Sequence, residues 1–243
     1  LKSWRDEMHR QMGWKHFLGG RPIGPNRGTD HAADAKWNLG LDYFSYEHHR
    51  PTYAVYLAAM QASSGRPVMS EDRFRIRKGV YPNKDYSEEL TRRGLYNSTL
   101  AGGVANIWGT DPQHSPGAVY RNRNQLKTYF VFFHGKRRFL RDMRPENHFS
   151  DNTDTRVLHS RAANSLILYR ENAGSIHLDL SGMPTALSAV AVDTKRAYSE
   201  IDLGDLQPKV QTIKLPVVSD WVLAVGQFAP FTPPKIPTRL MSM

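Results

Sequence analysis

The first 144 residues alternate between strand-like and helix-like segments, and this alternation constrains the fold more than any other feature of the sequence. Short apolar runs are separated by longer stretches of strong helix formers. Strands that alternate with helices at this spacing are usually parallel, with the helices packed outside, and functional side chains collect at the strands' carboxyl ends. The expected strands are 15–20, 39–49, 66–71 and 104–109, and the expected helices are 1–14, 52–64, 85–103 and 122–140.

The second half of the chain changes to short strand-like runs separated by Gly, Pro and Asn turns. Residues 1–144 carry 24 Lys and Arg against 13 Asp and Glu, whereas residues 145–243 carry 9 against 10. A change this sharp predicts a domain boundary near residue 144. We therefore expect an α/β domain over 1–144, followed over 145–243 by a small antiparallel β-sandwich with a Pro-rich tail.

Composition excludes or disfavours several classes of protein and site. The chain has no cysteine, so disulfides and thiolate chemistry are excluded. No apolar run is long enough to span a membrane. The first 14 residues look like an amphipathic helix with Trp4, Met8 and Met12 on one side, not an export signal, which suggests that the chain begins inside a domain. There is no Gly-rich phosphate loop and no paired His spacing, so neither a cofactor nor a metal is expected.

The strongest candidate for chemistry is Glu71, which ends the apolar run RPVMSE. The strand would hold its backbone, and an ionised carboxylate facing the site could act as a nucleophile or general base. A salt bridge from Glu71 to Arg73 or Arg21 that only ties down a loop explains the position equally well. Arg73 could instead bind a substrate carboxylate or sulfate, although a solvated loop is the more common arrangement.

Further candidates lie at the ends of the neighbouring expected strands. Glu47 could be a second carboxylate and His48 a proton carrier, but a role for Glu47 in orienting a histidine or capping the next helix is favoured. Tyr46 could donate a hydrogen bond to Glu71. Trp108 could stack against the C–H face of a sugar ring, and burial under the second domain explains it nearly as well.

The order of these segments resembles the carboxyl half of a clan of retaining glycoside hydrolases with a (β/α)8 barrel. In that clan the two catalytic glutamates follow the fourth and seventh strands. The run GRPVMSED resembles the seventh strand, LDYFSYEHH the sixth and GGVANIWG the eighth. The run EELTRRGLYNSTLAGGVANIWG is similar to the pattern of apiosidase-like glycoside hydrolases, and many of these enzymes carry a small β-sandwich after the barrel. The resemblance covers most of residues 1–228.

The resemblance implies strands five to eight of a TIM barrel followed by a β-sandwich, and retaining hydrolysis of a glycosidic bond in a poly- or oligosaccharide without a cofactor. It implies Glu71 as the nucleophile, Tyr46 as its hydrogen-bond donor and Trp108 as the sugar platform. The clan's acid/base glutamate has no counterpart here, so we expect a preceding chain or fragment to supply strands one to four. An extracellular or periplasmic location is also implied. The expected substrate-binding residues are Tyr46, Trp108, Glu47, His48, Arg21 and Arg73.

Two other classes of function stay open on the sequence. One is a non-catalytic glycan-binding or scaffold protein with a degenerate barrel. The other is a polyanion-binding protein driven by the basic half, although the sequence contains no recognisable nucleic-acid module. An anionic glycan would suit the net charge of +10. The sugar, the linkage and the oligomeric state are not determined by these patterns.

Overall fold

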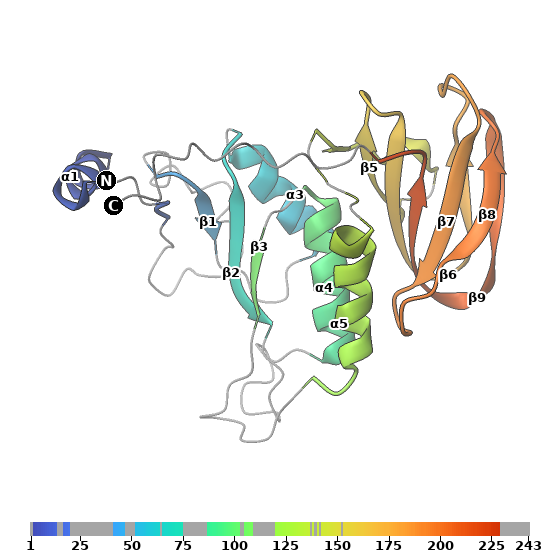
Figure 1. Ribbon diagram of the computed structural model, residues 1–243, viewed down its shortest axis with the longest axis horizontal. Coiled ribbons are helices and arrows are strands. Elements are labelled where there is room, and N and C mark those ends of the chain that lie inside the picture. The colour runs from blue at the N-terminus through green and yellow to red at the C-terminus, as the bar shows by residue number, and fades with distance from the viewer. Residues whose placement is uncertain are drawn as a thin grey trace, which may run out of the picture.

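The computed structural model of the chain contains a small parallel sheet and a larger antiparallel sheet, with helices between them (Figure 1). For residues 45–46, 70–74 and 105–108 only the backbone is described. The structure describes residues 2–13, 17–19, 41–46, 52–63, 65–74, 87–102, 105–108, 120–136, 138, 140, 142–151 and 153–228.

The first half contains three parallel strands in the order β1-β2-β3, and helices connect each strand to the next. This confirms the expected alternation of parallel strands with helices on the outside. A π-helical turn continues the last helix. The elements are β1 (Phe44–Tyr46), α3 (Tyr53–Ala62), β2 (Val68–Phe74), α4 (Glu88–Leu100), β3 (Ala105–Trp108), α5 (Arg123–Phe130) and the π-helical turn Val131–Gly135.

The strand expected over 15–20 is the exception to this agreement. Residues 17–19 are described and lie in no strand. The Leu18 carbonyl instead accepts hydrogen bonds from the Asp42 and Tyr43 amides, at 2.8 and 3.3 Å, and the Asp42 carboxylate accepts one from the Leu18 amide. Leu18 is therefore hydrogen-bonded to the residues just before β1, but residues 17–19 form no strand ladder with them.

Helix α1 (Lys2–Met12) confirms the expected amphipathic helix at the start of the described chain. None of its residues is buried, and Trp4 and Met12 are 58% and 47% exposed. In Figure 1 this helix stands apart from the other helices, beyond β1. Its apolar side therefore contributes nothing to the core of the described chain.

The ends of α3 and α4 follow capping rules that were partly visible in the sequence. Gly65 and Gly102 follow the ends of these helices and have φ angles of +79° and +82°, a region that favours glycine. Helix α4 begins at Glu88, three residues after the start of its expected range. Helix α4 is capped by Ser87, whose hydroxyl accepts a hydrogen bond from the Leu90 amide at 3.1 Å.

The second half forms one hydrogen-bonded antiparallel sheet of six strands in the order β4-β5-β6-β9-β7-β8. Strands β6 and β9, which are separated in the chain by β7 and β8, form a long antiparallel pair with register shifts on either side of Ala173. The antiparallel β-structure expected here is confirmed, whereas a two-sheet sandwich stays a prediction. The strands are β4 (Arg144–Pro145), β5 (Arg156–Ser160), β6 (Ser165–Asp179), β7 (Leu187–Asp193), β8 (Ile201–Leu206) and β9 (Val210–Val225).

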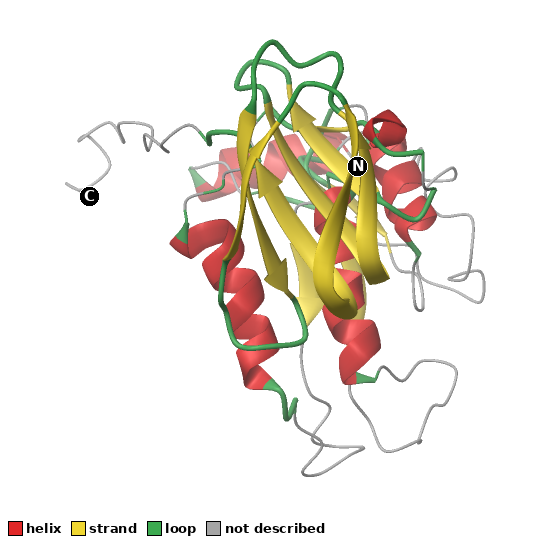
Figure 2. Cartoon of the chain, turned by 90° about the vertical axis from the view of Figure 1, so that its right-hand side faces the viewer, coloured by secondary structure: helices red, strands yellow, loops and turns green. Residues whose placement is uncertain are grey.

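This antiparallel sheet is buried on both faces at its centre. Along β6, Leu166 and Leu168 belong to one apolar cluster, while Ile167 and Tyr169 belong to another. Because successive side chains of a strand point to opposite faces, the two clusters lie on opposite sides of the sheet. Figure 2 shows the sheet face on, with helices behind and beside it.

One of these clusters joins both halves of the chain. It contains Phe44 and Val68 from the parallel strands, Leu100 from α4, and Ile167 and Val222 from the antiparallel sheet. The helices therefore form a middle layer between two sheets. Although β4 begins at Arg144, the domain boundary near residue 144 stays a prediction. None of the described helices has the length and apolar character needed to cross a bilayer.

Candidate functional site

The parallel strands bring three of the predicted site positions to the same edge of the small sheet. Tyr46 is the last residue of β1 and Trp108 the last residue of β3, and both strands pair with β2. In this register Tyr46 lies beside Ser70, and Ser70 lies beside Asn106. Glu71 follows Ser70 directly, so its backbone lies just after the last residue of β2 that pairs with β1. Carboxyl ends of parallel strands are where such folds place ligands.

Strand β2 does not stop at Glu71 as the sequence suggested. It continues to Phe74, which pairs with Trp108. The register between β2 and β3 shifts between Ser70 and Phe74, so the ladder is interrupted at the segment that contains Glu71. Such irregularities re-aim side chains and are over-represented next to active sites.

The backbone register also assigns positions to the two faces of the parallel sheet. Phe44 and Val68 are paired residues, and both are buried in the cluster that includes the helices. Strand alternation puts positions 46 and 70 on that helix-covered face and positions 45 and 69 on the other. Glu71 lies in the segment where the register shifts, so this alternation does not fix its face.

The remaining predicted site residues are not brought together by the described residues. Arg73 lies within β2, two positions after Glu71, with only its backbone described. Glu47, His48 and Arg21 lie outside the described residues, so their predicted roles stay predictions. In the described ranges, no group of three or more His, Asp or Glu is placed to hold a metal ion.

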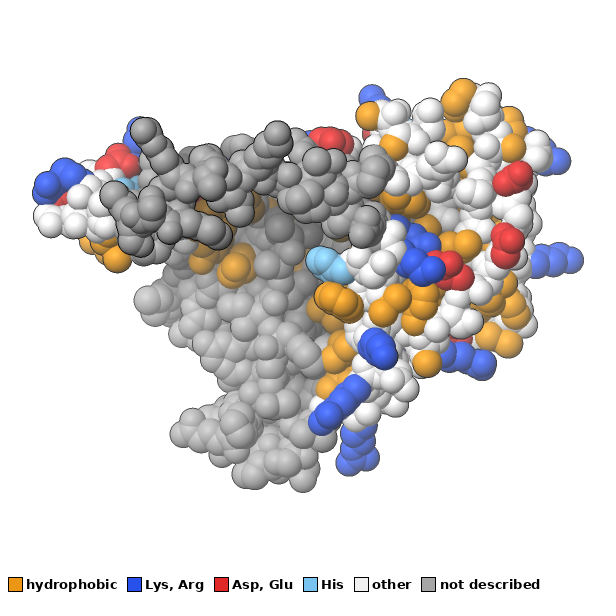
Figure 3. Space-filling model, viewed as in Figure 1, with side chains coloured by type: hydrophobic (Ala, Val, Ile, Leu, Met, Phe, Trp, Pro, Cys, Tyr) orange, Lys and Arg blue, Asp and Glu red, His pale blue; other side chains and the backbone are white. Residues whose placement is uncertain are grey.

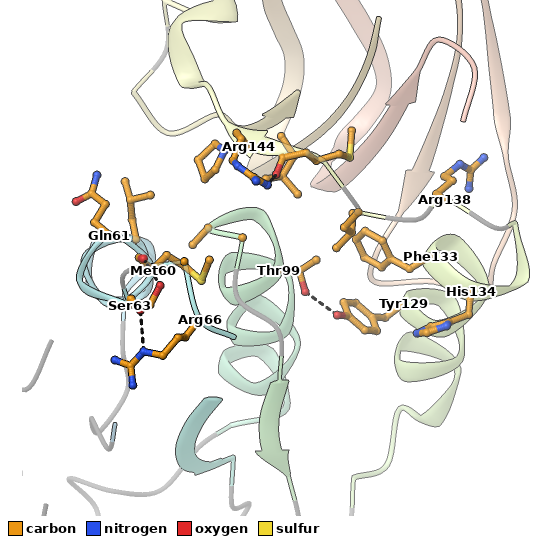
Figure 4. Close-up of a pocket in the computed structure, with 18 residues that line it drawn as sticks. Met60, Gln61, Ser63, Arg66, Thr99, Tyr129, Phe133, His134, Arg138 and Arg144 are labelled. Carbon is orange, nitrogen blue, oxygen red and sulfur yellow. Dashed lines mark hydrogen bonds between the residues drawn. The ribbon is translucent and has the colours of Figure 1, made fainter. Parts of the chain in front are cut away.

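An apolar cavity of about 770 Å³ lies at the opposite end of the same helices (Figure 4). Its walls come from the carboxyl ends of α3 and α4, the π-helical turn and the segment that enters β4. Arg66 lies at its edge and donates hydrogen bonds to the carbonyls of Ser63 and Leu41, at 3.0 and 3.1 Å. Since Leu41 and Arg66 precede β1 and β2, this cavity faces the amino ends of the strands. It is therefore separate from the edge that holds Glu71.

A buried ionic cluster at the junction of the two halves was missed by the sequence interpretation. The Asp220 carboxylate of β9 accepts hydrogen bonds from Arg92 at 2.6 Å, from Arg93 at 2.8 Å and from the Asn172 amide at 2.9 Å. Lys195 lies 3.3 Å away. The only signal in the sequence was a carboxylate inside an otherwise apolar strand, PVVSDWVLAV.

This cluster fixes the ionisation of its members. Burial alone would raise the pKa of Asp220, but hydrogen bonds from Arg93, the Asn172 amide and Arg92 outweigh burial and hold that pKa well below its usual range. The cluster also raises the pKa of Arg93, because its bonds to Asp220 outweigh the cost of burial. Helix α4 is the next helix after β2 in the chain. It is thus held against the antiparallel sheet by ion pairs as well as by apolar packing.

Comparison with known proteins gives similarity in structure only. No protein-family model matches the sequence, and no curated protein matches it. A glycoside hydrolase family 5 protein from Bacteroides vulgatus superposes with a TM-score of 0.58 at 18% identity, over 81% of this chain and 52% of that one. A second solved structure, described as a glycoside hydrolase, gives a TM-score of 0.59 at 15% identity over 81% of this chain and 55% of its own.

The chain thus spans about half the length of these solved structures. At such low identity the similarity concerns the fold alone. The arrangement of parallel strands, connecting helices and antiparallel sheet is therefore similar in fold to these two glycoside hydrolases.

Proposed function

We propose that this chain is the part of a retaining glycoside hydrolase that carries the nucleophile, Glu71. The observation that supports this most directly is the backbone position of Glu71. In β2, the middle of three parallel strands, it lies just after the last pair with β1 and where the ladder with β3 is interrupted, in a glycosidase-like fold. An interrupted ladder at a strand end is where a side chain can be directed out of the sheet toward a substrate.

In the proposed reaction the ionised Glu71 carboxylate attacks the anomeric carbon and forms a glycosyl ester. A second carboxylic acid protonates the departing glycosidic oxygen, then acts as the base that activates water to hydrolyse the ester. The two carboxyl groups must lie roughly 5–5.5 Å apart on either side of the bond. Glu71 and Asp72 are the only acids of β1, β2 and β3, and two residues adjacent along one strand are not placed on either side of a glycosidic bond.

The second carboxylate must therefore come from another segment. We propose that a preceding chain or fragment supplies it with the remaining strands, as the half-length match to the solved structures supports. Trp108 would stack against the sugar, and Arg73, with Glu47, His48 and Arg21, would contact it. A hydrogen bond from Tyr46 to Glu71 requires the register shift to turn one of the two side chains toward the other.

The test is substitution of Glu71 by Gln in the protein assembled with its complementary half, with Asp72→Asn as the matched control. Glu71→Gln should lower glycoside turnover by a factor on the order of 10³ or more, because a neutral amide cannot attack. Asp72→Asn should leave most of the turnover. A 2-deoxy-2-fluoroglycoside should also leave a covalent label on the peptide that contains Glu71, seen by mass spectrometry. Equal activity of the two variants, or a label elsewhere, would remove Glu71 from the nucleophile role.

A binding-only role is the second candidate, favoured by the absence of a usable second carboxylate on β1, β2 and β3. Under that reading the protein binds a glycan without cleaving it. Glycan binding without turnover in the assembled protein would support it. A general polyanion-binding role has less support from the part of the chain that the structure describes, where the basic side chains on the face seen in Figure 3 are scattered among acidic, apolar and neutral ones. We keep an extracellular or periplasmic location as a proposal, which cell fractionation would test.

A further inference from the structure

A second, polar cavity of about 610 Å³ lies where α3 and α4 meet the antiparallel sheet. Its volume falls within the range of small-ligand sites, roughly 300–1,000 Å³. Its walls come from the first residues of α3, the side of α4 that carries Arg93 and Asn97, the start of β5 and the bulged segment of β6. The first residues of α3 follow β1 in the chain, so this cavity lies nearer the carboxyl ends of the parallel strands than the apolar cavity does.

A buried hydroxyl in the wall of this cavity is unused. Tyr169 is buried, and its hydroxyl has no hydrogen-bond partner among the described residues. Its ring stacks on Tyr96, with centroids 4.8 Å apart and planes 10° apart, which fixes its position. The hydroxyl has less than 1 Å² of accessible surface, so a ligand reaches it only where the cavity wall opens. A ligand that then accepts its hydrogen bond would remove a cost of about 1–3 kcal/mol, that of a buried hydroxyl without a partner.

The wall beside Tyr169 carries two arginines, Arg156 and Arg170, and one acid, Asp154. Arg156 is the direct cross-strand neighbour of Tyr169, and its guanidinium lies 4.5 Å from the centre of the Tyr53 ring. Tyr53 is the first residue of α3. The Thr52 side chain makes no capping bond, and the first turn contains no acid. The amide groups and the dipole of an uncapped helix start favour an anion, and Arg binds carboxylates in a bidentate manner.

The opposite wall is polar and already ordered. Asn97 of α4 donates to the Glu171 carboxylate at 3.1 Å, and Glu171 lies 3.2 Å from Arg93. Asn172 has a φ of +50°, an uncommon conformation for a residue other than glycine, at the β6 bulge. Carboxylate and amide groups of this kind pair with hydroxyl groups as donors and acceptors.

We propose that this cavity binds a sugar that bears a carboxylate, such as a uronic acid unit of a longer glycan. The carboxylate would lie against Arg156 and the start of α3. The sugar hydroxyls would pair with Tyr169, Asn97 and Glu171. The proposal rests on carbohydrate as the substrate class of the proposed function, but it does not require Glu71 to be a nucleophile.

The test compares binding of methyl β-D-glucuronide and methyl β-D-glucoside by calorimetry and by amide shifts in NMR spectra of the whole chain. Wild type should bind the glucuronide at least about tenfold more tightly than the glucoside, since hydrogen bonds to charged groups are the stronger ones. The glucuronide should shift the amides of the β6 bulge. Equal affinity for the two glycosides, or no glucuronide binding, would overturn the proposal.

Two substitutions locate the site. Tyr169→Phe keeps the ring stacked on Tyr96 but removes the hydroxyl, and should weaken glucuronide binding about fivefold. Arg156→Gln should weaken it about tenfold or more. Tyr96→Phe is the matched control: its hydroxyl is also buried without a partner among the described residues, but it does not line the cavity. Binding by Tyr96→Phe should match wild type. The same loss in both Tyr variants would show that the effect is structural and overturn the site.

The glucuronide-binding test and the turnover test of the proposed function can fail independently of each other. Glu71→Gln should leave glucuronide binding at this cavity unchanged while it removes turnover. Retained binding in a protein without glycosidase activity would therefore reject only the proposed function. Turnover without glucuronide binding at this cavity would reject only the present inference.

Discussion

The Arg92 guanidinium donates a hydrogen bond of 2.6 Å to the Asp220 carboxylate, and the two side chains are 4% and 0% exposed. Arg92 belongs to α4 and Asp220 to β9, 128 residues apart in the sequence. The pair therefore joins the helix that follows the candidate catalytic strand to the centre of the antiparallel sheet. Asp220 also accepts hydrogen bonds from Arg93 and from the Asn172 amide, so its buried negative charge is paired with positive charges and hydrogen-bond donors.

Asp220→Asn should lower the free energy of unfolding by about 3–5 kcal/mol, because it leaves the Arg92 and Arg93 charges at the junction without their carboxylate. Urea denaturation monitored by circular dichroism measures this. Asp205→Asn on β8, at an exposed position, should change stability by less than about 0.5 kcal/mol. Equal stability of the two variants would show that the cluster is not a structural lock.

The stabilisation by Asp220 should depend on pH. Its folded-state pKa is lowered, so its contribution is fully present above the unfolded-state pKa of about 3.9 and is lost as pH falls toward the folded value. The stability difference between wild type and Asp220→Asn should be constant above about pH 5. It should shrink by about 1.4 kcal/mol per unit once the pH is well below 3.9. Denaturation curves of both proteins between pH 7 and pH 3 test this, and a difference that grows on acidification would contradict the assignment.

The antiparallel sheet should be sensitive to cavities on both faces. Ile167→Ala and Leu168→Ala should each cost about 2–5 kcal/mol, because each side chain is fully buried, one toward the helices and one in the opposite cluster. Val218→Ala, at a position 73% exposed, should cost less than about 0.5 kcal/mol. Thermal denaturation followed by circular dichroism would show these shifts. A small effect for Ile167→Ala alone would mean that helices and sheet are not packed into one core.

Gly226, directly after β9, should not tolerate a side chain. Its φ is +87°, and a Cβ there would lie 2.6 Å from the Asn164 carbonyl oxygen. Gly226→Ala should therefore cost at least about 1–3 kcal/mol. Gly182→Ala is the control, since that glycine has no positive φ and its Cβ would contact nothing within 4 Å. Denaturant midpoints of the two variants give the comparison, and equal midpoints would contradict the expected strain.

Local patterns in the sequence predicted most of the elements. The alternation of strand-like and helix-like runs correctly indicated β1, α3, β2, α4 and β3, because propensity, apolar period and glycine stops such as Gly102 act within one element. The failures were also local. Residues 17–19 of the run expected over 15–20 lie in no strand, and α4 begins at Glu88 after its Ser87 cap, not at residue 85.

The candidate site was predicted only as a set of strand ends. Parallel pairing brings Tyr46, Glu71 and Trp108 to one edge, as their places after apolar runs had indicated. The continuation of β2 to Phe74 and the register shift around Glu71 could not be read from the sequence, because a bulge depends on how a neighbouring strand pairs.

The sequence by itself thus determined the type and order of most of the elements and the position of Glu71 after an apolar run. Only the tertiary structure decided which distant residues share a core or a charge. The pairing of Arg92 with Asp220, the two buried faces of β6 and the cavity around Tyr169 all join segments far apart in the chain. Such contacts depend on how whole elements pack against one another, and no local pattern along one strand or helix records its partner.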